Sequence, residues 1–368
     1  MKRTGIANLP LHGGKAPAWL FSRMKKLARE VTLWIVQEFG PEEVLQRLSD
    51  PFWFQAFGCA LGFDWHSSGV TTTVCGALKE GLQDVSHEIG LFVGGGKGGR
   101  SRKTPSEIEA VCEKISLDAK PLVYASRMSA KVDSAAVQDG YQIYQHCFIF
   151  TGSGNWCVVQ QGMNEENGYA RRYHWIGQSV KDFVCEPHNA VCCDQRGEVL
   201  NMVAQESGPS RESSTWVARQ EPAKVLAELK KVATLELPRR HFVSLSDIES
   251  TRMQKIFLKT YERQPDNFEK LLGGKGVGPK TIRALALLGE LMYGTKPSLR
   301  DPARFSFAHG GKDGHPFPVD KATYDRSIEI LRDGLRKAKI EYTEREKAFR
   351  RLAGFEGTSW RHARHGST

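Results

Sequence analysis

Residues 265–294, PDNFEKLLGGKGVGPKTIRALALLGELMYG, decide the fold of the C-terminal part of the chain. Apolar residues recur at helical spacing on both sides of a short glycine-rich break. The glycines at 276 and 278 permit positive φ and let another group approach the backbone without a Cβ in the way. Pro279 suits the first turn of a helix, where its missing N–H costs nothing. The stretch therefore predicts two helices joined by a tight hairpin, with Val277 packed into the core.

Such a helix-hairpin-helix presents backbone donors to an anion. The free N–H groups and the positive dipole end of the second helix favour a phosphate group there. Hairpins of this kind bind the DNA backbone, so we expect affinity without sequence preference that falls steeply with salt. The residues expected to contact DNA here are Lys275, Gly276, Val277, Gly278 and Thr281.

The composition supports a polyanionic partner. The 368 residues carry a net charge of +10, and nucleic acid is the commonest partner of so basic a chain, although a solvated basic surface would give the same charge. The chain has no apolar run long enough to span a membrane and no apolar segment after Met1-Lys2-Arg3, so a cytoplasmic protein is expected. The eight scattered cysteines are then expected to be free, mostly buried thiols, and no cofactor is expected.

The periodicity of apolar residues predicts a mainly α protein with a smaller β region, of the α+β class. The pattern is helical from about 17 to 48, with a break at Gly40-Pro41, whereas residues 141–161 alternate as two strands around a turn at 151–154. Residues 205–215 are polar and resemble a loop, and a helix is predicted from Pro222 to Val232. The predicted parts are a helical region (1–140), a β region (141–215), a helical domain that contains the hairpin (222–340) and a basic tail (341–368).

A second basic segment lies at 94–105, GGGKGGRSRKTP. It holds Lys97, Arg100, Arg102 and Lys103 and no acidic residue. The glycines predict a flexible loop, which could follow a phosphate backbone and become ordered on binding. A solvated linker is the alternative interpretation.

The hairpin resembles that of the endonuclease-III-like superfamily of DNA glycosylases. Members carry Gly-Val-Gly, one residue and then Lys, followed later by an apolar-Val-Asp before a helix; here these are Gly276 to Lys280 and Pro318-Val319-Asp320. The resemblance implies that Lys280 is the amine nucleophile and Asp320 the catalytic carboxylate. It also implies removal of a damaged base from double-stranded DNA and strand cleavage through a lysine Schiff base. The chain as a whole resembles an archaeal and bacterial family of unknown function.

Two points leave alternatives open. The segment between Lys280 and Asp320 is longer than in most members, so Asp313 or Asp325 could be the acid instead. At a helix N-terminus near other cations the protonated amine of Lys280 is disfavoured, which suits attack on C1′ of a flipped nucleotide. The alternative is that Lys280 only contacts phosphate, in a non-catalytic repair or recombination factor.

Other residue groups give weaker signals. A zinc site and a metal-dependent nuclease site are each alternatives that the residue spacing favours little. Core packing and plain surface exposure are the commoner roles of the aromatic and charged residues concerned. The groups are Cys185, His188, Cys192 and Cys193 for zinc; Asp139, Glu165 and Glu166 for a nuclease; Asp64 to Ser68 for a polar pocket rim; Trp65, Tyr144 and Trp156 for base stacking; and Lys131 and Asp133, which could contact DNA but which nothing in the sequence distinguishes from surface residues.

Overall fold

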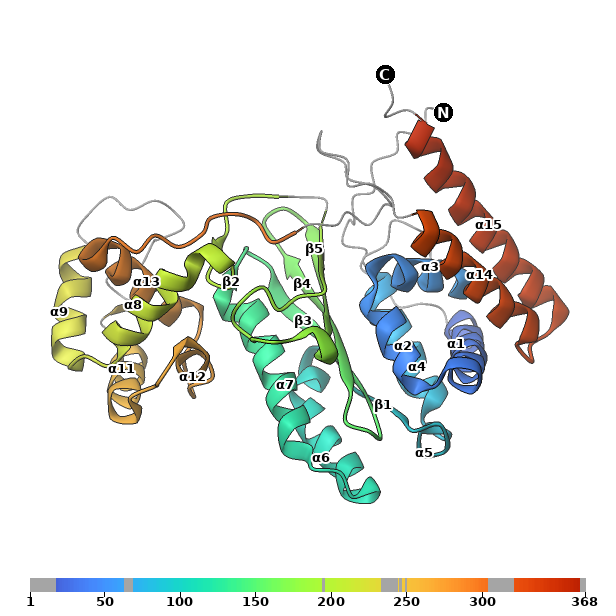
Figure 1. Cartoon of the computed structure of the whole chain (residues 1–368), viewed down its shortest axis with the longest axis horizontal. Helices are drawn as coiled ribbons and strands as arrows, with labels where there is room; N and C mark the ends of the chain where they lie inside the picture. Colours follow the sequence, from blue (N-terminus) through green and yellow to red (C-terminus); the bar gives the residue numbers. More distant parts are fainter. Residues whose placement is uncertain are drawn as a thin grey trace.

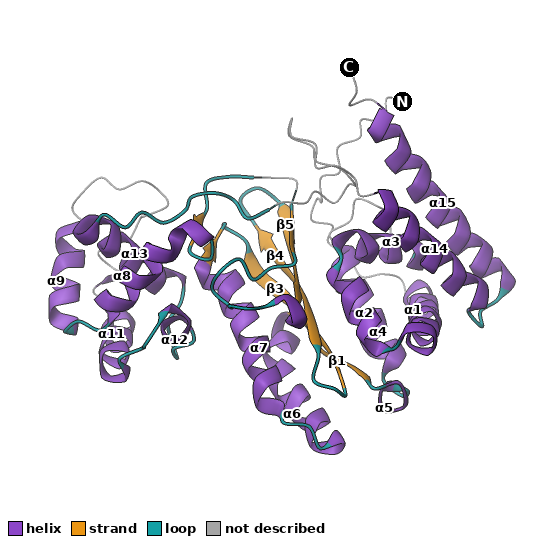
Figure 2. Cartoon of the chain, viewed as in Figure 1, coloured by secondary structure: helices purple, strands orange, loops and turns teal. Residues whose placement is uncertain are grey.

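The computed structural model describes residues 18–62, 69–193, 196–232, 244, 247–248, 250–303 and 321–364. Helices dominate and one small antiparallel sheet lies among them, which confirms the predicted mainly α, α+β class (Figure 2). Within these ranges no helix is long and apolar enough to cross a membrane. All eight cysteines are free thiols, and only Cys185 among them is not buried.

A five-stranded antiparallel sheet forms the middle layer, in the order β1-β3-β4-β5-β6 (Figure 1). Side chains alternate across β3, so that Phe148 and Phe150 enter one hydrophobic core and Cys147 and Ile149 the other. The predicted strand pair at 141–161 is confirmed as β3 and β4. The strands are β1 (Leu91–Lys97), β3 (Gln142–Thr151), β4 (Trp156–Asn164), β5 (Tyr169–Ile176) and β6 (Ala190–Cys192), with a separate pair β2 (Val137–Gln138) and β7 (Leu200–Asn201).

Helices from both ends of the chain cover one face of the sheet. The Asp50 carboxylate accepts hydrogen bonds from the amides of Phe52 and Trp53 and so caps α3, whose aromatic residues fill this core. Leu331, Leu335 and other residues near the C-terminus complete the same core. The helices on this side are α1 (Ala18–Phe39), α2 (Pro41–Ser49), α3 (Pro51–Leu61), α4 (Gly69–Leu82), α14 (Lys321–Lys337) and α15 (Tyr342–Arg364), with the short α5 (Ser86–Ile89) leading into β1.

The other face carries α6 and α7, and beyond them lies a group of helices that includes the hairpin (Figure 1). A continuous core joins these helices to the sheet, because residues of α7, β5 and α13 all belong to it. The elements on this side are α6 (Thr104–Ile115), α7 (Ala119–Lys131), α8 (Gly208–Ala218), α9 (Pro222–Val232), α11 (Thr251–Arg263), α12 (Phe268–Leu272) and α13 (Pro279–Tyr293), with the short turns η1 (Gly98–Lys103), η2 (Val132–Ala136), η3 (Gly177–Ser179) and η4 (Gln205–Ser207).

The segment 94–105 is not the flexible loop that its glycines predicted. Residues 94–97 end β1, residues 98–103 form η1, and α6 begins at Thr104. Gly95 has φ +91°, and a Cβ there would lie 2.1 Å from the carbonyl oxygen of His146. The glycine therefore serves a close strand approach, and the carboxylate of Glu107 fixes its amide nitrogen at 2.7 Å.

Three predicted boundaries are also wrong. Residues 205–215 are η4 and most of α8, because the polar run supplies serines whose hydroxyls bond within the helix instead of a loop. The segment 222–340 is not one domain, since α14 contacts α1 and α3 in the other core. The predicted basic tail is a helix over its described part, because α15 (Tyr342–Arg364) packs against α3 and places Ala348 and Leu352 in the same core.

Candidate functional site

The predicted hairpin forms between α12 and α13. Gly276 has φ +94°, a left-handed value that favours glycine, whereas Gly278 has φ −147°, which any residue adopts. Val277 is 2% exposed and belongs to the core, as predicted. The sequence was therefore right about the hairpin and its plug, and only one of the two glycines is required by backbone conformation.

The hairpin leaves a set of amides available to a ligand. Within the described residues no side chain caps α13, and the amides of Gly278, Lys280 and Thr281 donate to no other group. The Thr281 side chain is buried and its hydroxyl faces the sulfur of Met253. Thr281 can therefore contact a phosphate only through its main chain.

Exposed cations surround the same hairpin. Lys259 and Arg263 on α11 lie with Lys270 and Lys275 around a small hollow that reaches Gly274 and Val277. All four side chains are on the surface, and of these only Lys275 was predicted from the sequence. The four-residue spacing of 259 and 263 on one helix was the signal available.

Lys280 lies in the first turn of α13 with its side chain 67% exposed. Its ammonium forms an ion pair with the carboxylate of Asp247, and this hydrogen bond lowers the pKa of Asp247. Sequence reasoning missed Asp247, which no motif marks. Asp320, Asp313, Lys312 and the Asp325 side chain lie outside the described residues, and α14, which begins at Lys321, contacts α1 and α3 instead of α13.

The segment Lys131–Asp139, here called the connector, joins the hairpin to the interior. Lys131 ends α7 and donates hydrogen bonds to the carbonyl oxygens of Gly274 and Val277. At the other end of the connector Gln138 donates to the carbonyl oxygen of Pro279 at 2.8 Å. Lys131, which the sequence did not distinguish from a surface residue, is not one, because its ammonium holds the inner carbonyls of the hairpin and burial lowers its pKa.

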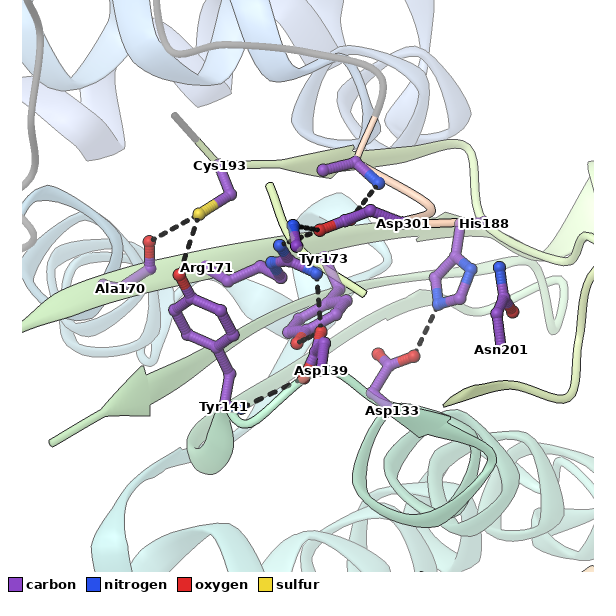
Figure 3. A network of polar contacts seen from close by, with 12 residues as sticks. Asp133, Asp139, Tyr141, Ala170, Arg171, Tyr173, His188, Cys193, Asn201 and Asp301 are labelled. Carbon is purple, nitrogen blue, oxygen red and sulfur yellow. Dashed lines mark hydrogen bonds and ion pairs between the residues drawn. The ribbon is translucent and has the colours of Figure 1, made fainter. Parts of the chain in front are cut away.

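A buried polar network begins at Asp139, the last residue of the connector (Figure 3). Arg171 on β5 forms ion pairs with Asp139 at 2.9 Å and with Asp301 at 2.8 Å, and all three side chains are at most 6% exposed. Tyr173 donates to the Asp139 carboxylate at 2.6 Å. Burial lowers the pKa of Arg171, but the two carboxylates outweigh it and hold that pKa well above its usual value. The guanidinium is therefore a fixed charge that cross-links the connector, the sheet and the segment after α13.

Asp133 is the second buried acid of the connector, and it contacts His188 (Figure 3). It lies in η2, a π-helical turn, and its side chain is 0% exposed, so it is not a surface residue either. Trp175 donates to the same carboxylate from its indole nitrogen at 3.0 Å. His188 lines a pocket of about 140 Å³ together with Glu186, Asn201, Arg300 and Asp301.

The remaining predicted residues are not gathered at one site. Lys97, Arg100, Arg102 and Lys103 are exposed on β1 and η1, which contact β3 and α6 instead of the hairpin. Trp156 stacks between Phe148 and Phe183 in the core. The Lys97 ammonium lies over the ring of Tyr144, 5.7 Å from the ring centre. The segment Asp64 to Ser68, with Trp65, lies outside the described residues.

The zinc and nuclease alternatives find no support in the described part of the chain, where no group of three or more His, Cys, Asp and Glu residues could hold a metal ion. Cys193 contacts the hydroxyl of Tyr141 and His188 contacts Asp133, so neither faces a shared ligand position. Of the three acids of the nuclease alternative, Asp139 is bound by Arg171, and Glu165 and Glu166 are exposed in the turn after β4.

The sequence matches the family described as "Protein of unknown function (DUF763)" over residues 5–319, which is most of the 368-residue chain. The chain therefore belongs to this family. No curated protein and no solved structure matches it. The matched residues include the hairpin, the connector and the polar network, whereas α14 and α15 follow them in the chain.

Proposed function

We propose that this member of the DUF763 family binds the backbone of double-stranded DNA through the hairpin at 273–280. The observation that carries the proposal is the uncapped start of α13, with three unpaired amides and four exposed cations beside it. Amides at a helix N-terminus donate hydrogen bonds to a phosphate oxygen, and the cations add positive charge along the adjoining backbone. Nothing in this arrangement reads base edges, so the expected affinity has little sequence preference.

A charge-matched comparison tests the proposal. In one variant Lys259, Arg263, Lys270 and Lys275 become Gln; in the control variant four exposed lysines elsewhere, Lys114, Lys120, Lys224 and Lys347, become Gln. Binding of a fluorescent duplex is measured by anisotropy between low and moderate salt. Each lost phosphate contact should reduce the slope of log affinity against log salt by about 0.9. Equal losses in both variants would show a general charge effect and no site at the hairpin.

The basic segment of β1 and η1 is a second proposed contact. Its four cations are exposed, and η1 is fixed by its neighbours, so they would contact DNA without an ordering cost. Changing Lys97, Arg100, Arg102 and Lys103 to Ser should lower the affinity and the salt slope. If neither changes, the duplex does not extend to this side of the sheet.

Base excision with lyase activity through Lys280 is a second candidate function. The observation that favours it is an exposed amine in the first turn of α13, at the uncapped helix start where the hairpin would hold the DNA backbone. Attack on C1′ would expel the base and form an imine, which borohydride reduces to a protein–DNA adduct. Lys280→Gln should lose the adduct and keep DNA binding, whereas an undiminished adduct would assign the reaction to another amine.

A further inference from the structure

A pocket lies beside His188, whose ring contacts the buried carboxylate of Asp133. Figure 3 shows this contact between the two side chains. Asp133 accepts a hydrogen bond from the indole N–H of Trp175, which can only donate, and another from the amide nitrogen of Gln160. Both donors bond to Oδ2, and an ionised carboxylate can only accept, so the contact at Oδ1 of such a carboxylate is a donation from Nε2 of His188. Neutral His188 then carries its lone pair on Nδ1.

The ring of His188 is held in this orientation. Its side chain is 6% exposed, and the Trp175 ring stands edge-on to it with a centroid distance of 4.6 Å. Nδ1 makes no hydrogen bond to any described residue, and His188 lines the pocket. A histidine whose Nε2–H is fixed by a carboxylate and whose Nδ1 is unpaired has the arrangement of a general base.

Two features of the backbone mark the same place. Asp133 lies in a π-helical turn, a rare form that recurs at functional sites. Glu186, another lining residue, has φ +43°, a left-handed value that is strained for a residue with a side chain. The residue that holds His188 and one residue of the pocket wall therefore both stand at uncommon backbone positions, as residues at functional sites often do.

The charges on the pocket wall define what it can stabilise. Glu186 and Asp301 contribute carboxylates to the wall, and the carboxylates of Asp133 and Asp139 lie behind it, against His188 and Arg171. The guanidinium groups at these contacts are those of Arg171, which pairs with Asp139 and Asp301, and of Arg300, which is 65% exposed and shared between Glu186 and Glu206. An anionic group such as a phosphate would be repelled by this wall, whereas a centre that gains positive charge would be stabilised. The C1′ atom of a nucleotide gains such charge when its bond to the base breaks, because the transition state resembles an oxocarbenium ion.

We propose that this pocket is a hydrolytic site for the N-glycosidic bond of a nucleotide flipped out of bound DNA. The inference rests on the proposed DNA binding. The oxygen of a water molecule bonds to C1′ as the bond from C1′ to the base nitrogen breaks. Nδ1 of His188 takes the proton from that water, and the base leaves with the electron pair and is protonated by solvent. No covalent enzyme–DNA adduct forms, so this chemistry differs from that of Lys280.

The connector supplies the link to the DNA. Lys131, which binds the hairpin carbonyls, is two residues from Asp133, which holds His188. Gln138, which binds the Pro279 carbonyl, is next to Asp139 of the Arg171 network. The connector therefore joins the hairpin to the residue that holds His188, and we expect DNA held at the hairpin to reach the pocket along this side.

A binding experiment tests the charge of the pocket, and it does not require that the excised nucleobase be known. One duplex carries a pyrrolidine abasic analogue, whose ring is cationic, and a matched duplex carries neutral tetrahydrofuran at the same position. The wild-type protein should bind the pyrrolidine duplex at least about tenfold more tightly, as transition-state analogues do. Glu186→Gln should bring this ratio toward one. Glu165→Gln, which removes an exposed carboxylate in the turn after β4 that does not line the pocket, should leave it unchanged.

A reaction experiment tests His188 as the general base. Duplexes with single uracil, hypoxanthine, 8-oxoguanine or 3-methyladenine residues are assayed for base release with and without borohydride. Release without an adduct is expected for at least one of them, lost in His188→Gln and retained in Lys280→Gln, with urea unfolding used to check that His188→Gln folds. Equal affinity for the two abasic duplexes, release that needs Lys280, or no release from any base would overturn the pocket proposal. In each case hairpin-dependent binding would still be measured separately, so the two proposals fail independently.

Discussion

Lys131 is expected to position the hairpin without contacting DNA itself, and Lys131→Met tests this. The ammonium donates to the carbonyl oxygens of Gly274 and Val277 from a half-buried position. Hydrogen bonds from a charged donor contribute about 1.5–3 kcal/mol, and partial exposure places this one near the lower end, at about 1.5 kcal/mol. If DNA binding must restore the hairpin conformation at that cost, affinity falls by about tenfold.

The salt dependence separates positioning from phosphate contact. Lys131→Met should lower affinity with an unchanged slope of log affinity against log salt, because the lost charge faces carbonyls and not phosphates. Lys275→Gln should instead reduce the slope by about 0.9. Lys120→Met, on the exposed part of the same helix, is the control and should change neither quantity. A slope that falls in Lys131→Met as it does in Lys275→Gln would refute the positioning role.

Three other predictions concern the fold around the site. Gly276→Ala should destabilise the protein by about 1–2 kcal/mol, because a side chain is strained at φ +94° and its Cβ would lie 3.3 Å from Ile256. Gly278→Ala should cost no more than about 0.5 kcal/mol, because its φ is an ordinary extended value. Equal losses of stability in urea unfolding would contradict the assigned hairpin geometry. Arg171→Met should cost about 3–5 kcal/mol in the same assay, since it leaves Asp139 and Asp301 buried without their cation, and a loss below about 1 kcal/mol would contradict the buried network. Burial lowers the pKa of both His146 and His174, with the charge of Arg172 adding to the effect at His174, so the unfolded chain binds protons that the folded protein does not. Stability should therefore be fully present above about pH 6.5 and fall below it by up to about 1.4 kcal/mol per pH unit for each histidine, and unfolding curves that are the same at pH 7.5 and 5.5 would contradict this.

The hairpin could be predicted from sequence because its determinants are local. Gly276, Val277 and Pro279 fix the turn, the plug and the helix start within a few residues, and the structure shows each in its expected role. The strand pair β3–β4 could be predicted for the same reason, since the period of its side chains and its short turn lie in one stretch. These elements need no knowledge of distant parts of the chain.

The tertiary structure alone decided what those elements contact. The glycines of 94–97 indicated flexibility, but their neighbours use them for close packing against His146. The sequence did not distinguish Lys131 and Asp133 from surface residues, and it offered Asp139 only as an acid of a nuclease site. Burial, and partners distant in sequence such as Val277, become apparent only when the helices pack. Lys280 shows the same limit: the sequence suggested Asp320 as its acid, and the carboxylate that contacts it in the described structure is that of Asp247.

The contrast has one physical cause. Backbone conformation and side-chain periodicity are properties of neighbouring residues, so the sequence by itself determined the hairpin, the central strand pair and the mainly α class. The partner of a charged side chain depends on which surfaces the folded chain brings together. Only the tertiary structure decided that Lys280 meets Asp247, that α14 packs in the opposite core, and that Asp133 and His188 lie together beside a pocket.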